Sequence, residues 1–363
     1  MREPSFWWTE RSVAANLLAP VGACYGAFVA RRMARGGCEP AVPVICVGNF
    51  TLGGAGKTPT AIALARLLLE SGRHPFFLSR GYGGRTAGPV RVDHQPAIDV
   101  GDEPLLLART APTIVGRDRP AGAKAAAKGG ADTIIMDDGL QNPSVSKDLA
   151  LAVVDGRRGI GNGRVFPAGP LRAPLEVQLD HTDAIVLLGL AGRASGHAVD
   201  AAQRRGLPIF QGNLHPAPEA VAALADKPAL AFAGIADPTK FFATLESHGV
   251  AVIVRRPFPD HHRYSRRDIA ELLARAQRDG LALVTTEKDL MRLSGDPAAD
   301  DLVRQTMVLP VSVTFQDLPA VKTMLHSALP SPAGQETPPS VRRPLTGKRR
   351  HAASAGGRCK SKP

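Results

Sequence analysis

The sequence predicts an α/β protein built around a parallel sheet, and two observations lead to this. From residue 42 onward, short runs of β-branched and other apolar residues alternate with segments of helical character. A glycine-rich loop also joins the first of these runs to a helical segment. Strands that alternate with helices in this way form parallel sheets with helices on both faces.

The order of these segments predicts two folded domains with an extension at each end. The expected strands and helix of the first domain are residues 42–48, 59–71 (the helix), 74–79, 132–137, 149–155, 184–189 and 208–213. Residues 214–226 break the pattern, and a new strand-loop-helix run begins at residue 229, with further strands at 282–289 and 307–313. We therefore predict a helical segment over 1–40, a core domain over 41–220, a smaller α/β domain over 221–330 and a tail over 331–363.

The formal charge of +12 is concentrated in the tail. Eight Lys and Arg against one Glu follow residue 330, which leaves +5 for the first 330 residues. A tail rich in Pro, Gly, Ser and basic residues is expected to be disordered. We interpret it as a solvated extension and expect no nucleic-acid partner; the alternative is a tail that binds RNA or anionic lipid. The four cysteines form no C-x-x-C pair and lie near no histidine at ligand spacing, which argues against a zinc site and against a disulfide framework and fits a reducing cytoplasm.

The N-terminal segment has the pattern of an amphipathic helix at a membrane surface. Asn16 and Pro20 interrupt the apolar run over residues 12–30, which argues against a membrane span. Apolar residues recur at helical spacing at Leu17, Val21, Cys24 and Phe28. The aromatic residues Phe6, Trp7 and Trp8 precede them, and the basic residues Arg31, Arg32 and Arg35 follow them, as expected of a helix in the headgroup region. The alternative is a helix packed on the protein's own core.

The loop between the first strand and helix nearly matches the phosphate-binding pattern G-x-x-x-x-G-K-[ST]. Thr51 stands where the pattern has its first glycine, but Gly53 and Gly54 supply conformational freedom nearby. Backbone N–H groups here and the helix N-terminus would bind phosphate, with Lys57 at the β- and γ-phosphates and the Thr58 hydroxyl on Mg²⁺. The predicted nucleotide-binding residues are Thr51, Leu52, Gly53, Gly54, Ala55, Gly56, Lys57, Thr58 and Pro59.

Acidic residues follow the apolar run over residues 132–137 at the expected carboxyl edge of the sheet. Asp137 and Asp138 are therefore candidate metal ligands beside the phosphate loop. The guanine-reading pattern N-K-x-D is absent, which favours ATP over GTP.

A kinase also needs a group that accepts the proton of the receiving hydroxyl. Asp102 and Glu103 lie in an otherwise apolar string, and Asp260, His261 and His262 lie in the other domain. A carboxylate oriented by a histidine can act as a base. Because the two residues lie in different domains, closure of the cleft between the domains would assemble the base and so be coupled to phosphate transfer. The alternatives are a helix cap for Asp102 and a surface turn for His261.

Seven strings together resemble the tetraacyldisaccharide 4'-kinase family of the lipid A pathway, in the family's order. They are VGNFTLGGAGKTP, LSRGYGG, GDEP, IMDDGLQ, GNGRVFPAGPLRAP, FPDHHRY and TTEKD. The resemblance covers about residues 1–325. The family's loop carries the same departure from the glycine pattern. The resemblance implies a two-domain P-loop NTPase-like kinase, peripheral on the cytoplasmic face of the inner membrane, that uses ATP and Mg²⁺ on an acylated disaccharide lipid.

The resemblance also implies residue roles. Asp102 with His261 would form the base, Lys57 would act on the phosphates, and Thr58, Glu103, Asp137 and Asp138 would surround the metal. Tyr82, Gln141 and Arg172 would contact substrate or nucleotide. One departure is Asn142, which stands where the family usually has His and which cannot titrate. The main rival is a P-loop GTPase of the metallochaperone type, for which the guanine-reading motif and Cys or His clusters are missing.

Overall fold

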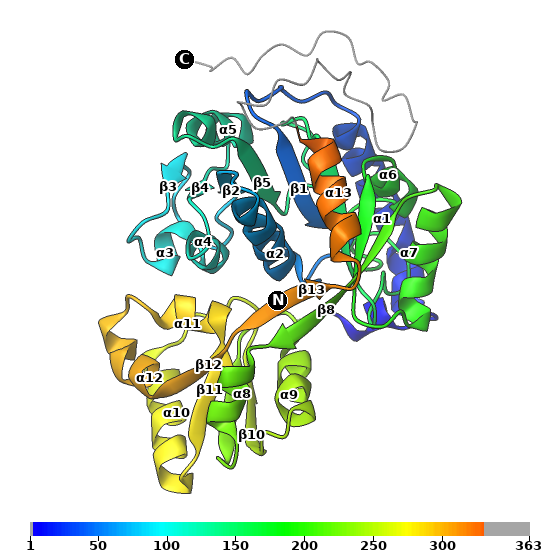
Figure 1. Ribbon diagram of the computed structural model, residues 1–363. Helices are drawn as coiled ribbons and strands as arrows, with labels where there is room; N and C mark the ends of the chain where they lie inside the picture. The colour runs from blue at the N-terminus through cyan, green and yellow to red at the C-terminus, as the bar shows by residue number, and fades with distance from the viewer. Residues whose placement is uncertain (1–2, 330–363) are drawn as a thin grey trace.

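The protein consists of two α/β domains side by side, as the computed structural model in Figure 1 shows. The structure describes residues 3–329. The predicted basic tail over 331–363 lies outside the described residues.

The larger domain contains a nine-stranded sheet in the order β13-β8-β7-β6-β1-β5-β2-β4-β3. Its strands are β1 (Val44–Asn49), β2 (Pro75–Ser79), β3 (Val90–Arg91), β4 (Thr113–Val115), β5 (Thr133–Asp137), β6 (Leu149–Asp155), β7 (Ala184–Leu188), β8 (Ile209–Pro216) and β13 (Val311–Phe315). β1 pairs in parallel with both β5 and β6, and only the edge pairs β3–β4 and β13–β8 are antiparallel among the described strands. Every residue of β1, β5 and β6 is buried, which explains their continuous apolar runs.

Helices cover both faces of this sheet. α2 (Lys57–Glu70), α4 (Asp102–Ala108) and α13 (Leu318–Ala328) pack on one face, with the short α3 (Ala97–Val100) beside α4. α5 (Arg119–Lys128), α6 (Leu175–Asp180) and α7 (Arg193–Arg204) pack on the other. The predicted doubly covered parallel sheet is confirmed.

The smaller domain repeats this architecture with four parallel strands. Their order is β10 (Val252–Pro257), β9 (Ala229–Ala233), β11 (Ala282–Thr286) and β12 (Thr306–Leu309). α8 (Pro218–Leu224) and α9 (Pro238–Ser247) cover one face. α10 (Arg266–Asp279), α11 (Glu287–Leu293), α12 (Asp300–Gln305) and the 3₁₀ turn η2 (Pro297–Ala299) cover the other.

The end of the described chain returns to the larger domain, which corrects two predictions. The single strand expected over residues 307–313 is divided at Pro310 into β12 of the small sheet and β13 of the large sheet. Proline has no N–H to donate to a ladder and restricts the residue before it, so the chain changes sheets there. The small domain therefore ends at β12 rather than at residue 330, and β8 and β13 form the two-stranded link between the domains (Figure 1).

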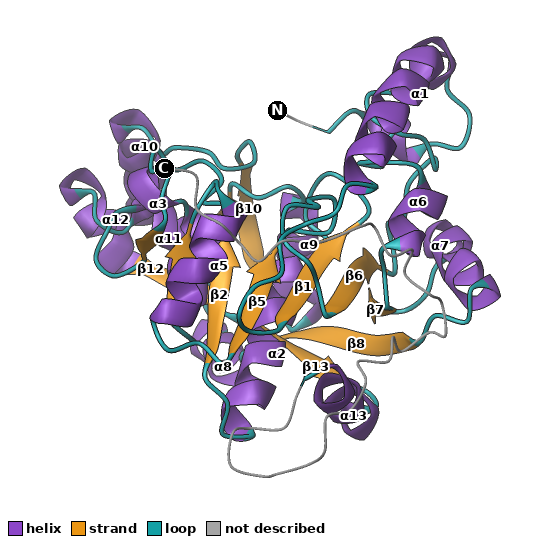
Figure 2. Ribbon diagram, turned by 90° about the horizontal axis from the view of Figure 1, so that it is seen from above, coloured by secondary structure: helices purple, strands orange, loops and turns teal. Residues whose placement is uncertain are grey.

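The N-terminal segment forms a 3₁₀ turn, η1 (Ser5–Trp8), and the helix α1 (Val13–Met33). Figure 2 shows α1 at one end of the molecule, beside α6 and α7. The helix packs on the domain through Ala15, Gly22, Gly26, Val29 and Met33. Its opposite face exposes large apolar side chains, namely Val13 (75%), Leu17 (75%), Val21 (55%), Tyr25 (40%) and Phe28 (65%). The predicted apolar face, Leu17, Val21, Cys24 and Phe28, is therefore the exposed side of α1 and not the side that packs on the domain.

Candidate active site

The phosphate loop, residues 51–56, connects the carboxyl end of β1 to α2 as the sequence predicts. Gly56 has a φ of 87° and immediately precedes the first helical residue, Lys57. A side chain at position 56 would require a conformation that L-residues rarely adopt. Thr51, by contrast, has no positive φ, so the backbone needs no glycine at the position where the phosphate-binding pattern asks for one.

Lys57 lies at the centre of the site with few partners for its charge. Its side chain is 9% exposed, its Nζ donates to Asn49 Oδ1 at 3.2 Å, and Asp138 Oδ2 lies 3.8 Å away. Burial lowers the pKa of Lys57, although the charge of Asp138 opposes that shift. An ammonium group held here with one neutral acceptor is available for an anion such as a phosphate group.

Asp138 is held in place by Arg172. The guanidinium of Arg172 donates to both carboxylate oxygens, at 2.8 and 3.0 Å, and also to the carbonyl of Thr51 at 2.8 Å. Desolvation would raise the pKa of Asp138, but the charges of Arg172 and Lys57 hold it below its usual range. Asp138 also has a φ of 51°, in the left-handed region that few residues other than Gly, Asn and Asp adopt readily.

Asp137, the last residue of β5, is buried and incompletely bonded. Its Oδ1 has no hydrogen-bond partner among the described residues, and burial together with the charges of Glu103 and Asp138 raises its pKa to about 7. A buried carboxylate oxygen without a partner is costly unless a cation binds it. Asp137 is therefore well suited to hold a divalent cation.

The acidic residues here suit an open Mg²⁺ site rather than a site in which the protein supplies every ligand. In the described range 3–329 no three His, Cys, Asp or Glu side chains converge as a metal site. Mg²⁺ usually keeps several waters and binds through one or two carboxylates together with substrate phosphates. Asp137, Asp138 and the Thr58 hydroxyl would hold it here. Glu103, also predicted to lie near the metal, pairs with Lys288 at 2.6 Å, and its charge helps to raise the pKa of Asp137.

Asp102 and His261 meet across the two domains, as the sequence predicts. Asp102 begins α4 of the larger domain, and its Oδ1 lies 3.3 Å from Nδ1 of His261 in the loop after β10. His261 has a φ of 54°, and its ring lies 5.0 Å from that of Tyr82. Burial would raise the pKa of Asp102, but the hydrogen bond with His261 and the charge of Arg292 hold it below its usual range.

Arg292 of α11 joins these groups. It contacts Asp102 Oδ2 at 2.7 Å, Asp289 Oδ1 at 2.7 Å and the carbonyl of Gly234 at 2.6 Å. Both carboxylates are almost fully buried. Arg292 thus neutralises two buried acids and connects α4 of the larger domain to the smaller domain.

Replacing Arg292 with Met is expected to lower the free energy of unfolding by about 3–5 kcal/mol, because two buried carboxylates lose their partner. Chemical denaturation measures this. Arg304→Met is the matched control, because Arg304 and its partner Asp301 are 69% and 70% exposed. Exposed pairs contribute about 0–1 kcal/mol. A similar loss in both variants would contradict the role given to Arg292.

Residues 14–330 match the family model for tetraacyldisaccharide-1-P 4'-kinase. The chain belongs to this family. A tetraacyldisaccharide 4'-kinase of Methylobacterium nodulans is 56% identical over 93% of this chain and 100% of its own length. One from Rhodopseudomonas palustris is 54% identical over 91% of this chain and 96% of its own. The solved structure of the Aquifex aeolicus family member in complex with ATP is similar with a TM-score of 0.68, at 25% identity, over 87% of this chain and 99% of its own.

The three residues predicted to contact substrate or nucleotide in this kinase family lie in different settings. Tyr82 is 64% exposed beside His261. Gln141 is buried, and its amide donates to the carbonyl of Asn49 and to Gln178, each at 2.7 Å. Arg172 is engaged with Asp138 and Thr51. In this structure Gln141 braces the end of β1 and Arg172 braces the phosphate loop, whereas Tyr82 is the most exposed of the three.

Asn142, at the position where the family usually has His, takes part in a local turn. Its Oδ1 accepts from the N–H of Ser144 at 2.9 Å, and its own N–H donates to the carbonyl of Gly139 at 3.0 Å. These bonds stabilise a turn after the acidic pair.

Sequence reasoning missed several residues that complete the site. They are Asn49, which holds Lys57; Gln178, which holds Gln141; and Lys288 and Arg292, which pair with Glu103 and Asp102. Lys288 lies in the TTEKD string and could have been found there, whereas no local pattern marks Arg292.

Proposed function

We propose that this chain transfers the γ-phosphate of ATP to the 4'-hydroxyl of a tetraacylated disaccharide 1-phosphate, a step in lipid A biosynthesis. The observation that supports it most is the contact of Asp102 with His261 beside the phosphate loop. Glu103, next to Asp102, is close enough for its charge to affect Lys57 and Asp137. The proton-accepting pair, Asp102 and His261, and the phosphate-binding loop would thus belong to one active site.

The loop residues would hold the triphosphate of ATP. Backbone N–H groups of residues 51–56 and the N-terminus of α2 favour anions, and Lys57 would neutralise charge that develops between the β- and γ-phosphates. The Thr58 hydroxyl and the Asp137–Asp138 pair would hold Mg²⁺, which would supply positive charge against the phosphates. Arg172 keeps Asp138 oriented toward this position.

Asp102 and His261 would accept the proton of the sugar hydroxyl as a unit. A carboxylate whose pKa is held low is a weak base by itself, and Asp102 is only 3% exposed. His261, with its side chain 26% exposed, lies on the accessible side of the pair. The hydrogen bond with Asp102 raises the pKa of His261 despite burial, so the carboxylate stabilises the imidazolium that forms.

The direct test is incubation of the purified chain with ATP, Mg²⁺ and the tetraacylated disaccharide 1-phosphate, followed by mass spectrometry. We expect a product heavier by one phosphate group. Transfer from GTP but not from ATP, or no transfer at all, would contradict the proposal. The GTPase alternative is not favoured, because the chain belongs to the kinase family over nearly its whole length.

The exposed apolar face of α1 supports a peripheral position on the cytoplasmic face of the inner membrane. In the described part of the chain, α1 alone is long and apolar enough to cross a membrane by length and composition. One face of α1 packs on the domain, however, which favours a helix lying in the membrane surface. Arg31, Arg32 and Arg35 at its end would bind anionic headgroups. This arrangement brings the active site to an acceptor embedded in the membrane.

Replacing Leu17, Val21 and Phe28 with Ser is expected to lower the liposome partition coefficient at least tenfold. Full burial of one such side chain contributes about 1.5–3 kcal/mol, and tenfold corresponds to about 1.4 kcal/mol. Liposome flotation measures the partition, and ATP affinity should be unchanged. Leu190→Ser with Ile253→Ser is the matched control, since these residues are 87% and 63% exposed outside α1. Unchanged flotation of the α1 variant would refute membrane binding through this face.

A further inference from the structure

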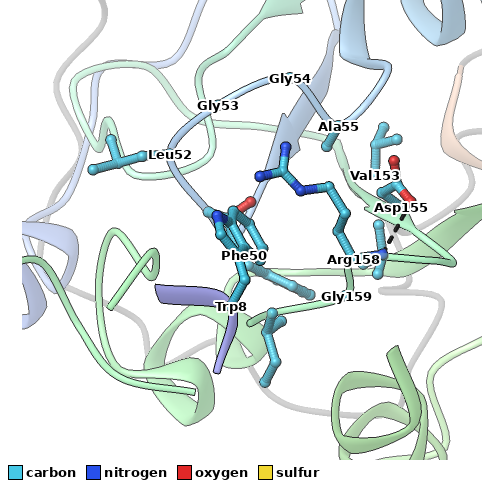
Figure 3. A pocket seen from close by; sticks show the side chains of 13 residues that line it. Trp8, Phe50, Leu52, Gly53, Gly54, Ala55, Val153, Asp155, Arg158 and Gly159 are labelled. Atoms are coloured by element: carbon cyan, nitrogen blue, oxygen red, sulfur yellow. Dashed lines mark hydrogen bonds between the residues drawn. The ribbon is translucent and has the colours of Figure 1, made fainter. Parts of the chain in front are cut away.

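A pocket with a partly buried arginine lies beside the phosphate loop. It is lined by the N-terminal segment, the loop itself and the end of β6, including Trp8, Phe50, Gly53, Gly54, Asp155 and Arg158. Figure 3 shows the side chain of Arg158 extending toward the loop residues Gly53 and Gly54, with Trp8 and Phe50 nearby. Neither Trp8 nor Arg158 belongs to the phosphate-binding or proton-accepting groups described for the active site.

Arg158 is held rigidly in this pocket. Its guanidinium lies 3.8 Å from the centre of the Trp8 ring, a cation–π contact. Asp155 fixes the loop that carries it, because Asp155 Oδ1 accepts from the N–H groups of Arg157 and Arg158 at 2.9 and 3.2 Å. Lys240 of α9 in turn holds Asp155 at 2.9 Å. A planar guanidinium fixed in this way is suited to bind a phosphate group through two donors.

The carboxylate of Glu3 occupies the position that such an anion would take. It forms an ion pair with Arg158 and lies against Gly53, where an added Cβ would clash with Glu3 Oε1. The occupant is poorly satisfied: Glu3 Oε1 and Trp8 Nε1 are both buried without a hydrogen-bond partner in the described chain. Burial raises the pKa of Glu3, although Arg158 opposes this shift. A ligand that replaced Glu3 and accepted from Trp8 Nε1 would remove both penalties.

We propose that Arg158 and Trp8 bind the 1-phosphate of the acceptor lipid and that Glu3 occupies this site until the acceptor displaces it. This inference rests on the proposed function, which supplies an acceptor with a phosphate. The bound phosphate could belong to the nucleotide or to the acceptor, and the position of Trp8 favours the acceptor. Trp8 ends η1, a few residues before α1, and the loop at 162–167 anchors η1 through Asn162 and Pro167. The pocket thus lies between the candidate membrane helix and the phosphate loop.

The test compares two acceptors, the tetraacylated disaccharide with and without its 1-phosphate, for binding to the full chain in detergent micelles without nucleotide. Arg158→Met should weaken binding of the phosphorylated acceptor at least tenfold, as expected for loss of a charged hydrogen bond. Binding of the acceptor without phosphate should change less than twofold. Glu3→Gln removes the competing charge and should tighten binding of the phosphorylated acceptor only.

Arg157→Met is the matched control, because Arg157 carries the same charge one residue away, pairs with Asp237 and has a 60% exposed side chain. It should leave both affinities within twofold of wild type. Equal losses for both acceptors in Arg158→Met, or no effect of Glu3→Gln, would overturn the inference. A tenfold loss of ATP affinity in Arg158→Met would overturn it in favour of a nucleotide phosphate. Binding is measured without transfer, so failure of the kinase assay leaves this result readable.

Discussion

Lys57→Ala is expected to abolish nearly all phosphate transfer while the protein stays folded. Lys57 is the cation of the phosphate loop, and within residues 3–329 its Nζ has only Asn49 and the more distant Asp138 as partners. No other cation in residues 51–58 can neutralise the charge that develops between the β- and γ-phosphates. Turnover with ATP and the acylated disaccharide 1-phosphate measures the loss.

Folding should survive because Asp138 keeps its two bonds with Arg172 when Lys57 is removed. Chemical denaturation of the variant checks this, and a free energy of unfolding near that of wild type is expected. Lys128→Ala, at the end of α5 on the other face of the sheet, is the control and should retain full activity. Turnover of Lys57→Ala within about tenfold of wild type, a barrier change of only about 1.4 kcal/mol, would show that this loop is not the catalytic one.

The central strands could be predicted because each is buried on both faces and therefore reads as a continuous apolar run. The turn at Pro310 could not be assigned in the same way. Residues 307–313 form one apolar run, and only the pairing of β13 with β8 shows that the chain changes domains. That pairing joins residues about a hundred positions apart, which local patterning does not encode.

In the candidate site, too, some features could be predicted from local sequence and others could not. The phosphate loop and the acidic pair are local strings whose chemistry is visible in the sequence, and their positions at the ends of β1 and β5 follow from the strand order. The partners that set their charge come from distant segments. Arg292 reaches Asp102 across 190 positions, and Arg158 reaches Glu3 across 155. The first pair depends on how the two domains pack and the second on where the N-terminal segment lies against the larger domain, so no spacing rule predicts them.

Asp102→Asn and His261→Ala should each lower turnover at least about 10²-fold, while ATP affinity stays close to that of wild type. General base catalysis typically contributes about 10²- to 10⁴-fold. The two side chains contact each other at 3.3 Å, and the buried carboxylate reaches the accessible side of the site only through the histidine ring. Asparagine keeps an oxygen for Arg292, so the contact between the domains should be preserved.

Because the pair acts as one unit, the double variant should be only slightly worse than the poorer single variant. Turnover and ATP binding of all three variants, with unfolding stability as a check, provide the measurement. His262→Ala is the matched control, because His262 is the next residue in the loop but pairs with Asp268 at 3.1 Å and stacks on Phe258. Its loss should change turnover by less than about threefold, well below the effect of losing a general base. Losses that multiply would mean that Asp102 and His261 act independently. A large loss of ATP affinity in Asp102→Asn would instead assign this carboxylate to the nucleotide and its metal, since a base for the acceptor hydroxyl contributes nothing to holding ATP.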